Sequence, residues 1–76
     1  MVYYLITKSQ YNTDHSNLPC TPAWNLDKTK CIILTPDDYT VNNPEQTWDT
    51  ANGCNEWRYS ESEKTNWMTD EDINGW

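Results

Sequence analysis

Four side chains of this chain could together bind a zinc ion: the imidazole of His15 and the thiols of Cys20, Cys31 and Cys54. Thiolates and imidazoles are the ligands that structural zinc prefers. Such sites usually contain two cysteines close together in sequence, whereas ten and twenty-two residues separate consecutive cysteines here. We therefore expect no metal ion and no other cofactor.

The residue types also give little support for catalysis. The chain has one histidine and no glycine-rich loop, so nothing selects a pair of nucleophile and base. The carboxylates at 37–38 and 70–72 are adjacent in sequence and point in different directions, and their positions suit the positive end of a helix dipole. The segment 70–75 is too short for a calcium-binding loop. We expect a protein that is not an enzyme.

The distribution of charge is the strongest signal in the sequence. The net charge is −7, and ten of the twelve carboxylates follow Leu34. Residues 35–76 contain these ten acids and two basic residues, Arg58 and Lys64, which gives a local balance of −8. Recognition of phosphates requires Lys and Arg, so we expect no direct binding to nucleic acid. A folded acidic surface can instead mimic nucleic acid and occupy the basic groove of another protein.

We predict that the acidic half binds a positively charged host or regulatory protein, as an inhibitor or a DNA mimic. The last ten residues combine carboxylates, which steer association, with side chains of the types that anchor interfaces. Trp76 either closes the core of the domain or fills a pocket on the partner. The predicted charge-bearing residues are Glu61, Glu63, Asp70, Glu71 and Asp72, and the predicted anchors are Trp67 and Trp76. Small acidic proteins of this kind are common in phages, which is an association and no physical argument.

Three other interpretations remain open. The chain could be a small structural subunit or decoration protein of a larger assembly or virion. Its acids could serve solubility alone. Tryptophan and tyrosine among Asn, Asp and Glu could also line a sugar site, although the same rings are expected to form the core of a domain that lacks Phe.

Size and composition limit the fold to one domain of 76 residues. Leu, Ile and Val number only ten, so the five Trp and five Tyr must supply much of the core, and most tryptophans are expected to be structural. No segment approaches the roughly 20 apolar residues that cross a membrane, and no secretory signal is visible. Together with an odd number of cysteines this favours the cytoplasm, while pairing of Cys20 with Cys54 stays open.

The expected fold is a small α+β domain with a mainly antiparallel sheet of three to four strands and one or two short helices. Residues 2–8, rich in β-branched and aromatic side chains, predict a central strand, and the short apolar run 30–34 predicts a second. The alternation at 56–60 predicts a third strand, with Trp57 and Tyr59 facing the core. Residues 9–28 predict a long ordered loop that Leu18 and Trp24 fix to the core.

Helix signals are weaker. Thr35-Pro36-Asp37-Asp38 resembles the start of a helix, but only about one turn of helix can follow it. The pattern at 43–46 predicts a helix over 44–52 that ends at Gly53. Residues 60–68 fit either a hairpin, with its turn at 60–63 and its returning strand at 65–68, or a short helix that ends at Met68. We favour the hairpin. Residues 69–72 allow one further turn at most.

Overall fold

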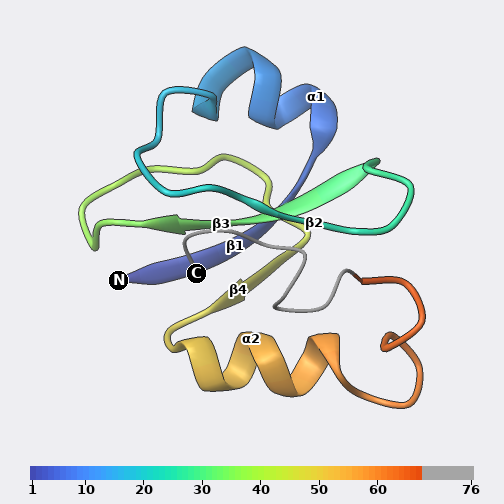
Figure 1. Cartoon of the computed structure of the whole chain (residues 1–76). Helices are drawn as coiled ribbons and strands as arrows, with labels where there is room; N and C mark the ends of the chain where they lie inside the picture. Colours follow the sequence, from blue (N-terminus) through green and yellow to red (C-terminus); the bar gives the residue numbers. More distant parts are fainter. Residues whose placement is uncertain (68–76) are drawn as a thin grey trace.

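A computed structural model, which describes residues 1–67, shows a four-stranded antiparallel sheet between two helical layers (Figure 1). The strand order is β2-β3-β1-β4, so β1 is central, as its apolar sequence predicts. The small α+β fold is therefore confirmed. The elements are β1 (Val2–Thr7), α1 (Lys8–Gln10), the π-helical turn η1 (Tyr11–His15), β2 (Ala23–Trp24), β3 (Lys30–Thr35), β4 (Gln46–Trp48) and α2 (Ala51–Arg58).

The predicted strands 2–8 and 30–34 are confirmed as β1 and β3, which pair along their whole lengths with Leu5 opposite Ile32. Side chains alternate across a strand, so neighbouring residues of β1 face opposite sides of the sheet. Leu5 belongs to the core on the α2 side, and Ile6 belongs to the core on the η1 side. Both faces of β1 are covered, which explains its unbroken apolar run.

The two cores use most of the tryptophans, as expected. Trp48, Trp57 and Trp67 pack on the α2 side around Leu5, Ala23, Ile32 and Cys54. Trp24 and Leu18 pack on the other side against Ile6, Cys31 and Ile33, which confirms that they fix the intervening segment to the core. Large rings thus replace the aliphatic side chains that this short chain lacks.

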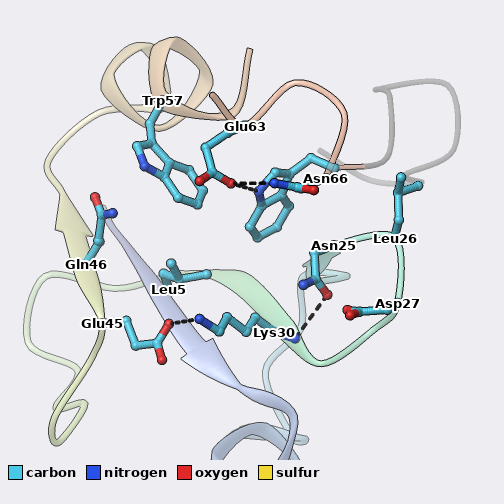
Figure 2. Close-up of a pocket in the computed structure, with 11 residues that line it drawn as sticks. Leu5, Asn25, Leu26, Asp27, Lys30, Glu45, Gln46, Trp57, Glu63 and Asn66 are labelled. Carbon is cyan, nitrogen blue, oxygen red and sulfur yellow. Dashed lines mark hydrogen bonds and ion pairs between the residues drawn. The ribbon is translucent and has the colours of Figure 1, made fainter. Parts of the chain in front are cut away.

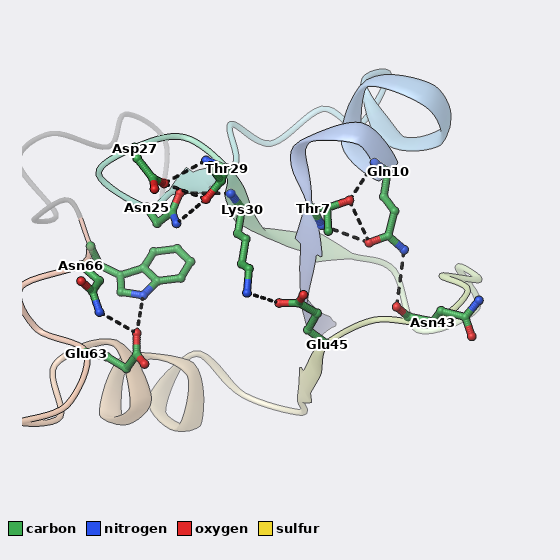
Figure 3. Close-up of polar contacts among 11 residues, drawn as sticks. Thr7, Gln10, Asn25, Asp27, Thr29, Lys30, Asn43, Glu45, Glu63 and Asn66 are labelled. Carbon is green, nitrogen blue, oxygen red and sulfur yellow. Dashed lines mark hydrogen bonds and ion pairs between the residues drawn. The ribbon is translucent and has the colours of Figure 1, made fainter.

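The prediction of a loop over 9–28 is partly wrong, because α1, η1 and β2 lie within or across it. α1 begins after Thr7, whose hydroxyl accepts a hydrogen bond from the Gln10 amide at 3.1 Å. The Gln10 side chain accepts one from the Thr7 amide at 3.0 Å in return (Figure 3). This reciprocal cap turns the chain away from the sheet at the end of β1.

The prediction of a helix over 44–52 and a strand over 56–60 is wrong. Gln46–Trp48 is strand β4, paired with residues 3–5 of β1, and Asn43 before it adopts a positive φ of 52°. The helix begins later, at Ala51, where the Thr50 hydroxyl caps the Gly53 amide at 3.3 Å. Gly53 lies in the first turn, where an added Cβ would be 3.3 Å from the Trp48 ring, so glycine serves close packing there.

Helix α2 includes residues 56–58 of the segment that was expected to form the third strand. It buries Cys54 and Arg58, one turn apart, and leaves Tyr59 44% exposed, so the prediction that Tyr59 faces the core is also wrong. The Arg58 guanidinium donates to Asn55 Oδ1 at 3.1 Å, and its central carbon lies 5.1 Å from the centre of the Tyr59 ring.

Residues 60–66 form successive turns, closed by backbone hydrogen bonds such as Lys64 N to Ser60 O at 2.9 Å. Neither the favoured hairpin nor the alternative helix forms in the described part of 60–68. Trp67 instead makes an antiparallel bridge with Asn25, beside a hydrogen bond from Leu26 N to Asn66 O at 2.8 Å. The segment thus lies against the residues that directly follow β2.

The predicted helix start at 35–38 is a single hydrogen-bonded turn, with Tyr39 N donating to Pro36 O at 3.1 Å. The amino group of Met1 forms an ion pair with Asp37 in that turn. No helix within residues 1–67 has the length and apolar character needed to cross a membrane.

Candidate functional site

A groove with a volume of about 480 Å³ opens on the α2 side of the sheet (Figure 2). One wall is the loop between β2 and β3, and the other is the end of α2 with the turns that follow it. Its size is within the range of small-molecule sites, about 300–1,000 Å³. The lining residues are Leu5, Asn25, Leu26, Asp27, Lys30, Glu45, Gln46, Trp57, Glu63, Asn66 and Trp67.

The β2–β3 loop is held by its own side chains (Figure 3). Asn25 Nδ2 donates to Thr29 Oγ1 at 3.1 Å, and Asn25 Oδ1 accepts from Lys30 N at 3.0 Å. Lys28 supplies the left-handed residue that closes the loop, with a φ of 58°. Asparagine and aspartate favour such turns because they hydrogen-bond to nearby backbone.

Asp27 in this loop is exposed and is held in its charged form. Its Oδ1 accepts hydrogen bonds from the Thr29 hydroxyl at 2.7 Å and from the Thr29 amide at 3.1 Å. These two bonds, the hydroxyl first, lower the pKa of the Asp27 carboxyl below its ordinary value of 3.8. Asp27 is therefore a fixed negative charge at the groove.

Glu63 on the opposite wall is positioned by the core. Its Oε2 accepts from the indole Nε1 of Trp67 at 3.3 Å and from Asn66 Nδ2 at 3.5 Å. Trp67 is 5% exposed and belongs to the α2-side core. The orientation of a surface carboxylate is thus tied to a buried ring.

Two further features complete the lining. The Trp57 ring is partly buried and lies 5.2 Å from the Trp48 ring and 5.3 Å from the Trp67 ring, centre to centre, so its packing restricts its motion. Lys30 Nζ forms an ion pair with Glu45 Oε2 at 2.8 Å across the floor (Figure 2). The groove therefore combines aromatic surface with three carboxylates and one ammonium group that is already paired.

The structure places three of the seven predicted binding residues. Glu63 and Trp67 come together in the groove. Glu61 is exposed and forms an ion pair with Lys64 at 2.8 Å, so it contributes less free charge than expected. Trp67, predicted as an anchor, is a core residue, and a partner would meet only the part of its ring that lines the groove. Asp70, Glu71, Asp72 and Trp76 lie outside the described residues.

Sequence reasoning missed Asp27 and Trp57 as site residues. Asn25-Leu26-Asp27 carries a turn signal, and Leu26, 57% exposed at the groove, is the kind of apolar side chain that turns rarely display. The alternating pattern around Trp57 predicts a strand, and a strand over 56–60 would not place Trp57 beside Glu63.

The groups considered for zinc and for a disulfide do not converge. Cys31 lies in the core on the η1 side, whereas Cys54 lies in the core on the α2 side. His15 Nδ1 is 2.6 Å from the Tyr39 hydroxyl, a hydrogen bond that occupies this nitrogen. Within residues 1–67 no three His, Cys, Asp or Glu side chains are grouped to hold a metal ion. Cys20 is a free thiol, so it is not bonded to Cys54.

Comparison of the chain with protein-family models, with curated proteins and with solved structures finds no match. The groove and the charged surface are therefore the basis for inferring function.

Proposed function

We propose that the chain is a non-enzymatic binding protein that uses the acidic surface of residues 35–76 to occupy or modulate a positively charged partner protein. The exposure of the carboxylates in this half of the chain is the observation that carries this proposal, since Asp37, Asp38, Asp49, Glu56 and Glu61 all lie at the surface. Arg58 is 0% exposed, so its positive charge is not presented at that surface. The one other basic residue of 35–76, Lys64, is already paired with Glu61.

Within residues 35–67 the exposed carboxylates therefore outnumber the one basic side chain exposed among them, Lys64. Asp38 and Asp49 are exposed and form no ion pair with any described residue. Like charges gathered on a folded surface repel one another, and this repulsion is relieved when a basic surface approaches. The same field would accelerate association with a basic partner at low salt.

Glu61, Glu63, Asp70, Glu71 and Asp72 are the proposed charge-bearing residues, and Trp67 and Trp76 the proposed apolar contacts. A cytoplasmic location is part of the proposal, because free thiols at Cys20 and Cys31 suit a reducing compartment. An inhibitor or a mimic of nucleic acid is the kind of protein that this description fits.

The test is capture of host proteins at about 50 mM and about 150 mM salt, a range over which screening of exposed charges increases. The site variant converts Glu61, Glu63, Asp70, Glu71 and Asp72 to the corresponding amides. A matched control variant removes the same number of charges elsewhere, at Asp14, Asp37, Asp38, Asp49 and Glu56. Each amide keeps the size of the carboxylate and one of its two acceptor oxygens.

We expect the unmodified protein to retain a basic protein at low salt, the control variant to retain it more weakly, and the site variant to lose it. Retention of the same protein by the site variant would contradict the proposal. Retention that is insensitive to salt would favour the alternative role, a subunit held by an apolar interface.

A further inference from the structure

The groove has an excess of negative charge that no described residue neutralises. Asp27, Glu45 and Glu63 line it together with one cation, Lys30. Lys30 is 2.8 Å from Glu45, so these two charges are matched. Asp27 and Glu63 form no ion pair with any residue of 1–67, and their hydrogen bonds are made to neutral donors. Two fixed carboxylates therefore face a shared space from two walls (Figure 2).

The groove also contains an aromatic surface of the type that attracts cations. The Trp57 side chain projects from α2 into the groove next to Glu63 (Figure 2). The face of an indole ring carries partial negative charge and binds a cation held above it, more strongly than the rings of Tyr or Phe do. A ring and a carboxylate at one site attract the same ligand for two different reasons.

We infer that this groove binds an arginine side chain of the partner protein. The inference rests on the proposed function, because it specifies how a basic partner is recognised. The planar guanidinium group can stack on the Trp57 indole and donate to the neighbouring Glu63, while Asp27 adds negative charge from the opposite wall. A lysine ammonium is more strongly hydrated and lacks the planar face, so arginine is favoured over lysine. Leu26, exposed at the loop, offers an apolar contact for the methylene stem of that side chain.

A neutral sugar is less compatible with the polar groups of the groove. Sugar hydroxyls need both donors and acceptors, and two of the three lining amides, Asn25 and Asn66, already donate within the protein. Both ends of the Asn25 amide are hydrogen-bonded, to Thr29 and to Lys30, and Asn66 Nδ2 donates to Glu63. The charged groups left without an ion pair among the lining residues are the carboxylates of Asp27 and Glu63, which an anionic or neutral ligand does not neutralise.

The test is a titration of the ¹⁵N-labelled full chain with a nona-arginine peptide, followed by the indole N–H resonances of Trp57 and Trp67. The D27N/E63Q variant removes the two groove charges while keeping acceptors for Thr29 and Trp67. The D38N/D49N variant is the matched control, since it removes two exposed charges that form no ion pair with any described residue. Circular dichroism melts establish that both variants remain folded.

We expect nona-arginine to shift the Trp57 indole resonance and nona-lysine to bind more weakly. The D27N/E63Q variant should weaken nona-arginine binding about tenfold, and the control less than about threefold. N-acetyl-arginine amide should shift the same resonance in the unmodified protein, a result that needs no variant. Equal losses in the two variants would overturn the inference and leave the proposed function intact, because charge alone would then explain binding.

Two other outcomes would also overturn the inference. A shift of the Trp57 resonance by maltotriose but not by nona-arginine would identify a sugar site. An unchanged Trp57 resonance at saturating nona-arginine would exclude the groove as the contact. Failure of the proposed function itself is recognised separately, in the capture experiment with the variant neutralised at residues 61, 63 and 70–72.

Discussion

The indole N–H of Trp67 donates a hydrogen bond to Glu63 Oε2 at 3.3 Å, which links a core ring to a carboxylate of the groove. The two residues are four positions apart in the segment that follows α2. Trp67 forms an antiparallel bridge with Asn25, which holds this segment against the β2–β3 loop. The hydrogen bond therefore joins a charged group of the groove to a ring of the core. We expect substitutions of Glu63 that remove this bond to lower the free energy of unfolding.

Replacement of Glu63 tests this contact. Glu63→Ala removes the acceptor of a largely buried N–H, and we expect it to lower the free energy of unfolding by about 1–3 kcal/mol. Glu63→Gln keeps an acceptor and should cost less than about 0.5 kcal/mol. Urea denaturation monitored by tryptophan fluorescence measures both values. Equal effects of the two substitutions would show that charge, and not the hydrogen bond, accounts for the stabilisation.

Truncation of Trp67 should have a much larger effect. Trp67 is 5% exposed and packs against Trp57, so Trp67→Ala leaves a cavity in the α2-side core. We expect a loss of about 3–5 kcal/mol, which approaches the entire stability of a domain of this size. The control is Leu26→Ala, at a side chain 57% exposed, with an expected change within about 0.5 kcal/mol. A folded Trp67→Ala protein with an unchanged melting temperature would contradict the assignment of Trp67 to the core.

The contribution of Asp27 to stability should depend on pH. The pKa of its carboxyl is lowered in the folded protein by the hydrogen bonds from Thr29, so the folded state favours the charged form. The resulting stabilisation is present above the unfolded value of 3.8 and is lost as pH falls through the lower folded pKa. Asp27→Asn should therefore be destabilising near about pH 7 and lose that effect near about pH 2. Urea denaturation at several pH values measures the difference, and a difference independent of pH would contradict the assigned contact.

The thiols should differ sharply in reactivity. Burial raises the pKa of the Cys31 thiol to about 12, so almost no thiolate exists at neutral pH. Cys20 is only partly buried. We expect iodoacetamide to modify Cys20 in the native protein and Cys31 only after unfolding in urea, as measured by peptide mass spectrometry. Rapid native modification of Cys31 would mean that β3 is not the buried strand described.

The same raised pKa predicts a loss of stability in alkali. Between the ordinary thiol value of 9.0 and the folded value of about 12, the unfolded chain releases a proton that the folded chain keeps. Stability contributed by the neutral Cys31 thiol is complete below pH 9.0 and declines as pH rises above it. Cys31→Ser, which does not titrate in this range, should reduce the alkaline decline in the free energy of unfolding.

The two long strands could be predicted because their conformation follows from the types of residue within each segment. Residues 2–7 are rich in β-branched and aromatic side chains and 31–34 form a short apolar run, both of which favour strands, and burial on both faces of β1 agrees with that pattern. The helix at 51–58 could not be predicted in the same way. Its buried face includes Arg58, which a hydrophobic pattern counts as polar, and the alternation of Trp57 and Tyr59 imitates a strand.

The groove depends on contacts distant in sequence. Asp27 and Glu63 lie 36 positions apart and share the groove because residues 66 and 67 pair with Leu26 and Asn25. A cap pattern at 43–46 was equally misleading, since β4 gains its conformation from pairing with β1 and not from local propensity. Charge, by contrast, is additive along the sequence, which is why the acidic character of the surface was evident before the fold.

The affinity of the captured partner as a function of salt tests the central claim most directly. It is measured for the unmodified protein, for the variant neutralised at residues 61, 63 and 70–72, and for the matched control, between about 50 mM and about 200 mM salt. We predict a steep loss of affinity for the unmodified protein, about tenfold or more, and weak binding with little salt dependence for the site variant. Equal affinity and equal salt dependence of the unmodified protein and the site variant would contradict the claim that these carboxylates dock the protein onto a basic partner.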